Sequence, residues 1–119
     1  MVDDLPAWLE TKHGRLVAVP YGLDVNDSVI YAIEKHSSPE MKLRIGEAVR
    51  TFEREIREQG RPRILTIPLH PHLSGVPHRI NYLTEAIDAL MARDDTVFLR
   101  GSQILEWFLS ESAQARTGT

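Results

Sequence analysis

Three of the five histidines in this chain fall within nine consecutive positions, at His70, His72 and His78. They lie in a polar segment, residues 70–79, which directly follows an apolar run. A neutral imidazole can bind a metal ion, and its ordinary pKa also lets it donate or accept a proton near neutral pH. The segment therefore predicts either a general acid or base, or part of a metal site.

The spacing of these histidines leaves the two chemistries open. His70 and His72 are two positions apart, so both rings would project to the same side of an extended segment. A catalytic zinc site needs three protein ligands, and residues 70–79 contain no Asp or Glu. A small self-sufficient zinc site would have to use His70, His72 and His78 together. The alternative without function is that these are loop histidines bonded to nearby backbone.

A second candidate is the pair Asn26 and Asp27, which ends the loop after an earlier apolar run. Such a pair can bind a substrate amide or hydroxyl, orient a catalytic histidine, or cap the helix that follows. Arg79 stands at the expected start of another helix, where a cation opposes the helix dipole. Its position indicates an anionic or carbonyl partner.

The elements that must position these residues alternate along the chain. Short apolar runs predict buried strands, and apolar residues at three- and four-residue steps predict amphipathic helices. Strands separated by helices form a parallel sheet, and ligands meet the carboxyl ends of its strands, where the candidate residues fall. The expected strands are residues 16–19, 64–69 and 96–99, and the expected helices are residues 28–36, 41–56, 80–91 and 101–109.

The predicted fold class is α/β, a partial (β/α) barrel with parallel strands and helices between them. We expect residues 16–19 and 64–69 to be parallel neighbours, with the apolar stripe of residues 41–56 packed on them. Three strands leave a sheet face or edge uncovered. Exposed apolar surface, self-association, or a partner chain that completes the barrel is therefore expected.

Composition excludes several classes of function. The net charge is −3, and basic residues are interleaved with acidic ones, so no nucleic-acid surface is expected. No apolar run approaches the length of a membrane span, and acidic residues near the start argue against a signal peptide, which predicts a cytoplasmic protein. The absence of cysteine excludes disulfides and thiolate chemistry. Trp8, Tyr21 and Trp107 are candidates for lining a sugar or ring site, with packing as the alternative.

Two segments carry a resemblance to a known family. They are Val19-Pro20-Tyr21-Gly22-Leu23-Asp24-Val25-Asn26-Asp27 and Leu69-His70-Pro71-His72-Leu73-Ser74-Gly75-Val76-Pro77-His78-Arg79. Together they resemble the C-terminal portion of the polysaccharide deacetylase superfamily (NodB-like, carbohydrate esterase family 4). The branch most similar to them holds the peptidoglycan deacetylase-like and allantoinase-like, cofactor-free amidohydrolases. The resemblance runs from about residue 5 to residue 108.

This resemblance implies an irregular (β/α) barrel longer than the present chain, of which residues 1–119 would be the C-terminal part, with a frayed tail from about residue 112. It implies hydrolysis of C–N bonds in N-acetylated sugars or small amides with a divalent metal, usually zinc. The family holds that metal with an aspartate and an H-x-x-x-H pair in the N-terminal half. No H-x-x-x-H occurs here, so this chain alone is expected to bind no metal and to be an incomplete, inactive fragment.

The resemblance also assigns roles to residues. His70 matches the family's late histidine, the general acid that protonates the leaving amine. His72, Asn26, Asp27 and Arg79 are then the expected substrate-binding residues, with Asn26 or Asp27 orienting groups beside His70. The rival without catalysis is a degenerate binding or assembly module, which pairs with a partner chain that supplies the metal half.

Overall fold

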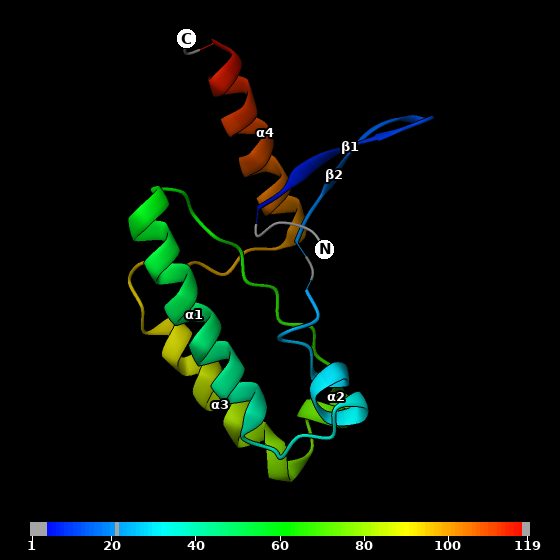
Figure 1. Ribbon diagram of the computed structural model, residues 1–119, viewed down its shortest axis with the longest axis vertical. Helices are drawn as coiled ribbons and strands as arrows, with labels where there is room; N and C mark the ends of the chain where they lie inside the picture. Colours follow the sequence, from blue (N-terminus) through cyan, green and yellow to red (C-terminus); the bar gives the residue numbers. More distant parts are fainter. Residues whose placement is uncertain (1–4, 21, 118–119) are drawn as a thin grey trace.

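The computed structural model describes residues 5–20 and 22–117, without the side chains of residues 114–117. This part of the chain is mixed α/β, with one two-stranded sheet and five helices (Figure 1). In chain order the elements are β1 (Ala7–Thr11), β2 (Gly14–Ala18), η1 (Ser28–Ile33), α1 (Glu40–Gln59), α2 (Pro71–Ser74), α3 (Pro77–Met91) and α4 (Gly101–Thr117). None of the helices described is long and apolar enough to cross a membrane.

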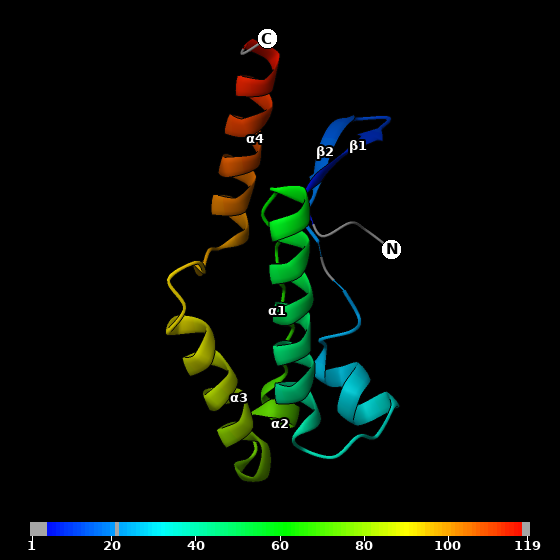
Figure 2. The same cartoon turned by 60° about the vertical axis from the view of Figure 1, so that its left-hand side comes forward.

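The elements form two groups. Helices α1 and α3 lie side by side, with η1 and α2 at their lower end (Figure 2). The β1–β2 hairpin lies beside α4 at the other end of the molecule, where Trp8 and Phe108 bring their rings to 5.6 Å (Figure 1). The Cα radius of gyration is 16.3 Å, against about 13.5 Å expected for a compact domain of this length. The chain is therefore more open than a self-contained domain.

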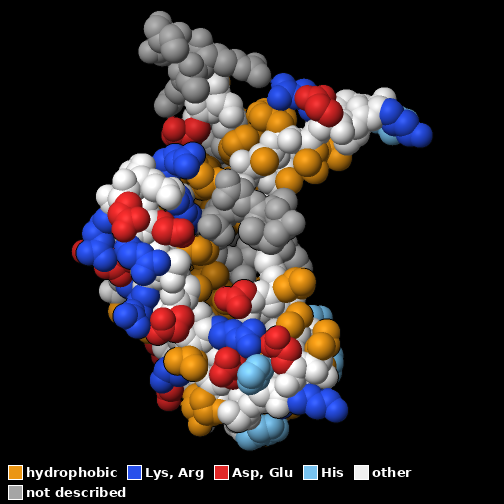
Figure 3. All heavy atoms as spheres, in the orientation of Figure 1, with side chains coloured by type: hydrophobic (Ala, Val, Ile, Leu, Met, Phe, Trp, Pro, Cys, Tyr) orange, Lys and Arg blue, Asp and Glu red, His pale blue; other side chains and the backbone are white. Residues whose placement is uncertain are grey.

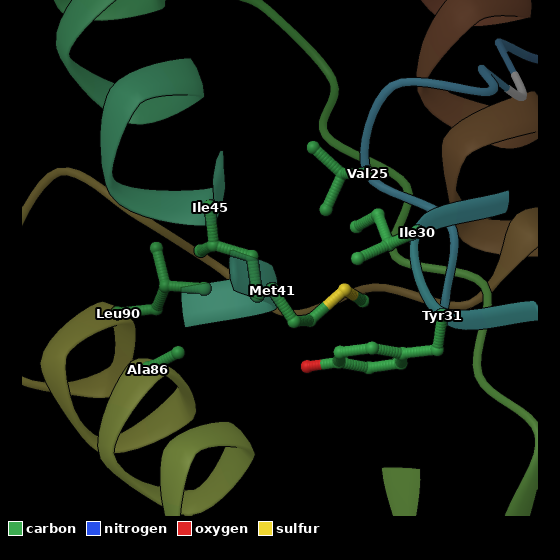
Figure 4. Close-up of a cluster of buried hydrophobic side chains, with 7 residues drawn as sticks. All are labelled: Val25, Ile30, Tyr31, Met41, Ile45, Ala86 and Leu90. Atoms are coloured by element: carbon green, nitrogen blue, oxygen red, sulfur yellow. The ribbon is translucent and has the colours of Figure 1, made fainter. Parts of the chain in front are cut away.

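A small core joins η1 and its preceding loop to α1 and α3. Met41 and Ile45 of α1 are each only 2% exposed, and Met41 lies between Ile45 and Tyr31 (Figure 4). Among the residues that the structure describes, this core cluster consists of Val25, Ile30, Tyr31, Met41, Ile45, Ala86 and Leu90. The predicted apolar stripe of residues 41–56 is thus buried at its start, whereas Ile56 near its end is 39% exposed. Gly60 ends α1 in the left-handed conformation with φ of 70°, as glycine does most easily.

The predicted parallel pairing was wrong. Strand β2 overlaps the expected strand at residues 16–19, but it pairs antiparallel with β1, and Thr11 faces Gly14 across a two-residue turn. A pairing closed by so short a loop costs less chain entropy than one between segments almost fifty residues apart. Residues 64–69 and 96–99 are not assigned as strands. Residues 64–69 do run beside the loop after β2, since Thr66 Oγ1 donates to the Pro20 carbonyl at 2.7 Å.

The helix after Asp27 differs from the expected one in its geometry. It is a π-helix, with the Glu34 amide donating to the Val29 carbonyl at 2.8 Å, five residues back. This wider turn rotates the buried face relative to an α-helix. The apolar residues Val29, Ile30 and Ile33 would share one face of an α-helix, but in this π-helix Tyr31 is buried and Ile33 is 70% exposed.

Helices α3 and α4 lie where the sequence predicts helices, but their bounds differ from the expected ones. The segment 70–79, expected to be a loop, contains the short helix α2, and α3 begins at Pro77, three residues before its first expected apolar position. Helix α4 continues to Thr117, through most of the polar segment expected to fray.

Figure 3 shows hydrophobic side chains exposed on the hairpin and along the inner side of α1. Val97, Phe98 and Leu99 are 75%, 55% and 47% exposed.

Replacing Ile45 with alanine should lower the free energy of unfolding by about 2–5 kcal/mol, because it removes a buried side chain from the junction of three elements. Leu43→Ala is the matched control, since Leu43 lies on the same helix and is 58% exposed. Its effect should stay within about 0.5 kcal/mol. Urea unfolding followed by circular dichroism measures both, and similar losses in the two variants would contradict the observed core.

Candidate functional site

The site centres on a contact between Asp27 and His70. Asp27 immediately precedes η1, and His70 immediately precedes α2. Nδ1 of His70 lies 2.7 Å from Oδ1 of Asp27, and the backbone N–H of His70 donates to Oδ2 at 2.6 Å. The carboxylate therefore binds both the ring and the backbone of the same histidine, which limits rotation of the imidazole.

A third donor completes the surroundings of the carboxylate. The hydroxyl of Ser74, at the end of α2, donates to Oδ2 of Asp27 at 2.9 Å. Asp27 is fully buried and Ser74 is 3% exposed. Burial by itself raises the pKa of Asp27, but the hydrogen bonds from His70 and Ser74 outweigh it and lower that pKa below its ordinary value. The group is thus an anion held by three donors.

This anion determines where His70 carries its proton. An ionised carboxylate only accepts hydrogen bonds, so Nδ1 of His70 must be the N–H that faces it. Nε2 is then the ring nitrogen left for another partner, and the His70 side chain is 46% exposed. A carboxylate behind Nδ1 with an accessible Nε2 is an arrangement that can exchange a proton with a bound molecule.

The other predicted site residues have different positions. His72 lies next to His70, with ring centroids 5.8 Å apart in an edge-to-face arrangement, and is exposed. Asn26 is 6% exposed, and its Oδ1 accepts a hydrogen bond from the Ser28 amide at 3.0 Å, so it supports the start of η1. Asp27 is also buried, and its carboxylate contacts the His70 ring.

Arg79 contacts two of the elements that form the site, η1 and α2. Its guanidinium carbon is 4.1 Å from the centroid of the Tyr31 ring, and Nη1 donates to the Leu73 carbonyl at 3.2 Å. Tyr31 is buried, and its hydroxyl donates to the Ser38 carbonyl at 2.7 Å. Burial is the main reason that the pKa of Tyr31 is raised above its ordinary value. These contacts fix Arg79 between η1 and the helices α2 and α3.

Arg44 anchors the loop that carries Asp27 to α1. Its Nη1 donates to the Asp24 carbonyl at 3.0 Å, Nη2 bonds Glu34 at 2.9 Å, and Nε bonds Glu40 at 3.0 Å. Burial alone lowers the pKa of Arg44, but these carboxylate partners raise it above its ordinary value. The two ends of the segment that contains Asp27 are thus tied to one helix.

Ser74 was not among the predicted site residues. The spacing could have identified it. His70 immediately precedes a helix that starts at Pro71, so Ser74, four positions after His70, lies one helical turn from it. Gly75 follows at a close approach, where an added Cβ would lie 2.6 Å from the Pro71 carbonyl oxygen. A side chain at this position would disturb the turn that separates α2 from α3.

The predicted aromatic candidates do not gather at the site. Trp8 packs against Phe108 and beneath Arg15, whose guanidinium carbon is 4.2 Å from the ring centroid. Trp107 lines a separate apolar hollow between α1 and α4. Tyr21 lies outside the described residues. Packing is therefore the observed role of Trp8.

The residues present do not form a metal site. Within residues 5–20 and 22–117, no group of three or more His, Cys, Asp or Glu side chains is arranged to hold a metal ion. His70 and His72 are neighbours, but His70 uses Nδ1 for Asp27. The rival zinc site built from His70, His72 and His78 has no support in this arrangement.

Solved structures of two proteins are among those that resemble this chain. A probable polysaccharide deacetylase from Pseudomonas aeruginosa PAO1 matches 86% of it with 28% identity and a TM-score of 0.75. Puue allantoinase matches 86% of it with 27% identity and a TM-score of 0.76. The chain resembles the polysaccharide deacetylase superfamily. It spans 34% of the length of each of these two proteins. No family model and no curated protein matches its sequence.

This likeness agrees with the resemblance found in the sequence, and both matched proteins share the NodB-like fold. The antiparallel hairpin and the unassigned extended segments differ from the predicted parallel strands.

The lowered pKa of Asp27 predicts how stability depends on pH. Because the unfolded chain binds this proton more tightly than the folded one, stability rises with pH between the folded pKa and the ordinary value. The contribution is complete above about pH 4, and it is lost as the pH falls through the lower folded value. Asp27→Asn should remove this component and flatten the acid limb of the free energy of unfolding, measured in urea at a series of pH values. Asp88→Asn, at an exposed position on α3, should keep the wild-type slope, and an unchanged slope in Asp27→Asn would contradict the assignment.

Proposed function

We propose that this chain contributes the proton-donating part of a polysaccharide deacetylase-like hydrolase, which cleaves non-peptide C–N bonds. The observation that carries this proposal is the buried Asp27 carboxylate bound to both the ring and the backbone of His70. The likeness to a probable polysaccharide deacetylase and to an allantoinase supports the class of reaction. N-acetylated sugars and small amides are the proposed substrates.

The proposed role of His70 follows from the chemistry of amide cleavage. Water adds its oxygen to the carbonyl carbon, the C–N bond breaks, and the departing nitrogen is too basic to leave without a proton. Nε2 of His70 supplies that proton, while Asp27 holds Nδ1 and stabilises the charged ring that precedes the transfer. Exposed His72 is the proposed substrate contact beside it.

A divalent metal, with zinc as the proposed ion, would polarise the carbonyl and activate water in the complete domain. The residues described here do not fit such an ion, since no group of three suitable side chains converges. We therefore place the metal ligands outside this chain's site and propose that the chain is inactive alone.

His70→Ala should lower turnover on an amide by about 100- to 10,000-fold, because a positioned acid is lost. The measurement uses a chimera, in which this chain replaces the matching third of the Pseudomonas aeruginosa protein, with an N-acetylated sugar oligomer as the amide substrate. A substrate with an activated leaving group should lose far less, since its nitrogen barely needs a proton. Metal content should be unchanged.

The control for this experiment is His13→Ala, which removes an exposed histidine in the hairpin turn. It should leave turnover on both substrates at the level of the parent chimera. Equal losses on both substrates in His70→Ala, or loss of the metal, would show that His70 has another role. A folded chimera without hydrolase activity would count against the function itself.

A second candidate function is that of an assembly module, which binds a companion polypeptide. The observation in its favour is an apolar hollow of about 440 Å³ between α1, α4 and the two extended segments. Phe52, Ile64, Phe98 and Trp107 are among the residues that line it. Residues 64–69 and 96–99 are predicted as strands from the sequence but are not assigned to a sheet, so a companion that presents β-strand edges would fit them. Such a companion would supply the metal half, and self-association is the alternative occupant.

Changing both Val97 and Phe98 to glutamate should reduce self-association and the binding of a hydrophobic dye, because charge is placed on the exposed rim of this hollow. Sedimentation velocity over a range of concentrations measures the first effect. Leu23→Glu is the control, since Leu23 is 67% exposed but does not line the hollow. A wild-type chain that stays monomeric and binds no dye at every concentration would refute this second function.

A further inference from the structure

The contact between Asp27 and His70 joins segments that are 43 positions apart in the sequence. Its geometry therefore depends on whatever holds η1 against α2. Arg79 contacts both elements, with its guanidinium over Tyr31 of η1 at 4.1 Å and Nη1 on the carbonyl of Leu73 in α2 at 3.2 Å. Arg79 is also part of α3, so it connects three elements around the site.

The surroundings of Arg79 are unfavourable apart from these two contacts. It lies in the first turn of α3, where the helix dipole repels a cation. Its Nε is buried and has no hydrogen-bond partner in the described part of the chain. The Tyr31 ring and the Leu73 carbonyl are thus the interactions that hold the guanidinium in place.

Tyr31 offers Arg79 a fixed surface. The tyrosine is 6% exposed, lies in the core beside Met41 and Ile30, and is tied through its hydroxyl to the Ser38 carbonyl at 2.7 Å (Figure 4). A planar guanidinium can stack on such a ring and donate a hydrogen bond from its edge at the same time, which an ammonium group does less well. The stack therefore transmits the position of η1 to the backbone of α2.

We propose that Arg79 is a positioning residue, which sets the separation of η1 and α2 and so keeps Asp27 against Nδ1 of His70. This inference differs from a substrate-binding role for Arg79. It rests on the geometry of the Asp27–His70 pair and holds whether or not the proposed hydrolase reaction is correct.

The test uses the chain itself and reads the protonation state of the His70 ring. In the wild-type protein, ¹⁵N correlation spectra at a pH where imidazole is neutral should show the Nδ1–H tautomer, with Nε2 free of hydrogen. Arg79→Met keeps a side chain of similar length but removes the stack and the donor. In this variant the ring should shift towards the Nε2–H tautomer that solvent-exposed histidine prefers, and its Nδ1 proton should exchange faster.

Arg15→Met is the matched control, because Arg15 makes the same kind of stack on Trp8 at 4.2 Å in the distant hairpin. Its spectrum should keep the wild-type His70 tautomer. A folded Arg79→Met protein with an unchanged His70 ring would overturn the proposal. So would the same change in Arg15→Met, since the effect would then be general.

Arg79→Lys decides the case if Arg79→Met does not fold. Lysine keeps the charge but loses the planar stack, so it should retain the helical circular dichroism signal while populating the Nε2–H tautomer measurably. A folded Arg79→Lys protein with the wild-type tautomer would show that the charge at this position, and not the planar guanidinium stacked on Tyr31, keeps His70 in place. That result would overturn the proposal.

Discussion

The structure depends on the burial of one carboxylate. A charged group without water must be surrounded by donors, and Asp27 has three, two from His70 and one from Ser74. Loss of a donor would leave a buried anion only partly satisfied, which is costly. The loop after β2 and the segment around α2 are thus required to lie together, and Arg44 and Arg79 hold the surrounding elements in matching positions. The geometry of the Asp27–His70 pair and the local stability therefore depend on the same atoms.

Much of the site could be predicted from the sequence, because each of the segments that form it has a recognisable local pattern. His70 directly follows an apolar run, and Asn26 and Asp27 end the loop after another. The sequence therefore predicted these residues at neighbouring strand ends, and the structure brings Asp27 and His70 together. Helix periodicity likewise located α1, whose buried residues Met41 and Ile45 belong to the predicted stripe. The sequence did not predict which partner each polar side chain contacts. Asp27 faces inward to His70, and Arg79 faces Tyr31.

The parts that were missed depend on pairing, which composition does not encode. An apolar run such as residues 64–69 predicts an extended backbone. A strand, however, forms only where a neighbouring segment supplies the partners for its backbone hydrogen bonds. For residues 16–18 of β2, that neighbour is β1. The sequence of β1 predicts a strand only weakly, through Trp8 and Leu9, and a two-residue turn follows it. The π-helical turns of η1 have no comparable signal, although they decide that Tyr31 and not Ile33 enters the core.

Helix α2 contains only four residues, Pro71–Ser74, and a helix of this length cannot sustain itself in water. Its persistence depends on the bonds that Ser74 and His70 make with Asp27. The short helix and the Asp27–His70 pair therefore constitute one cooperative unit, which opens and closes together. On warming, this unit should melt below the temperature at which the α1–α3 pair separates, so that the bond between Asp27 and His70 is lost before the fold.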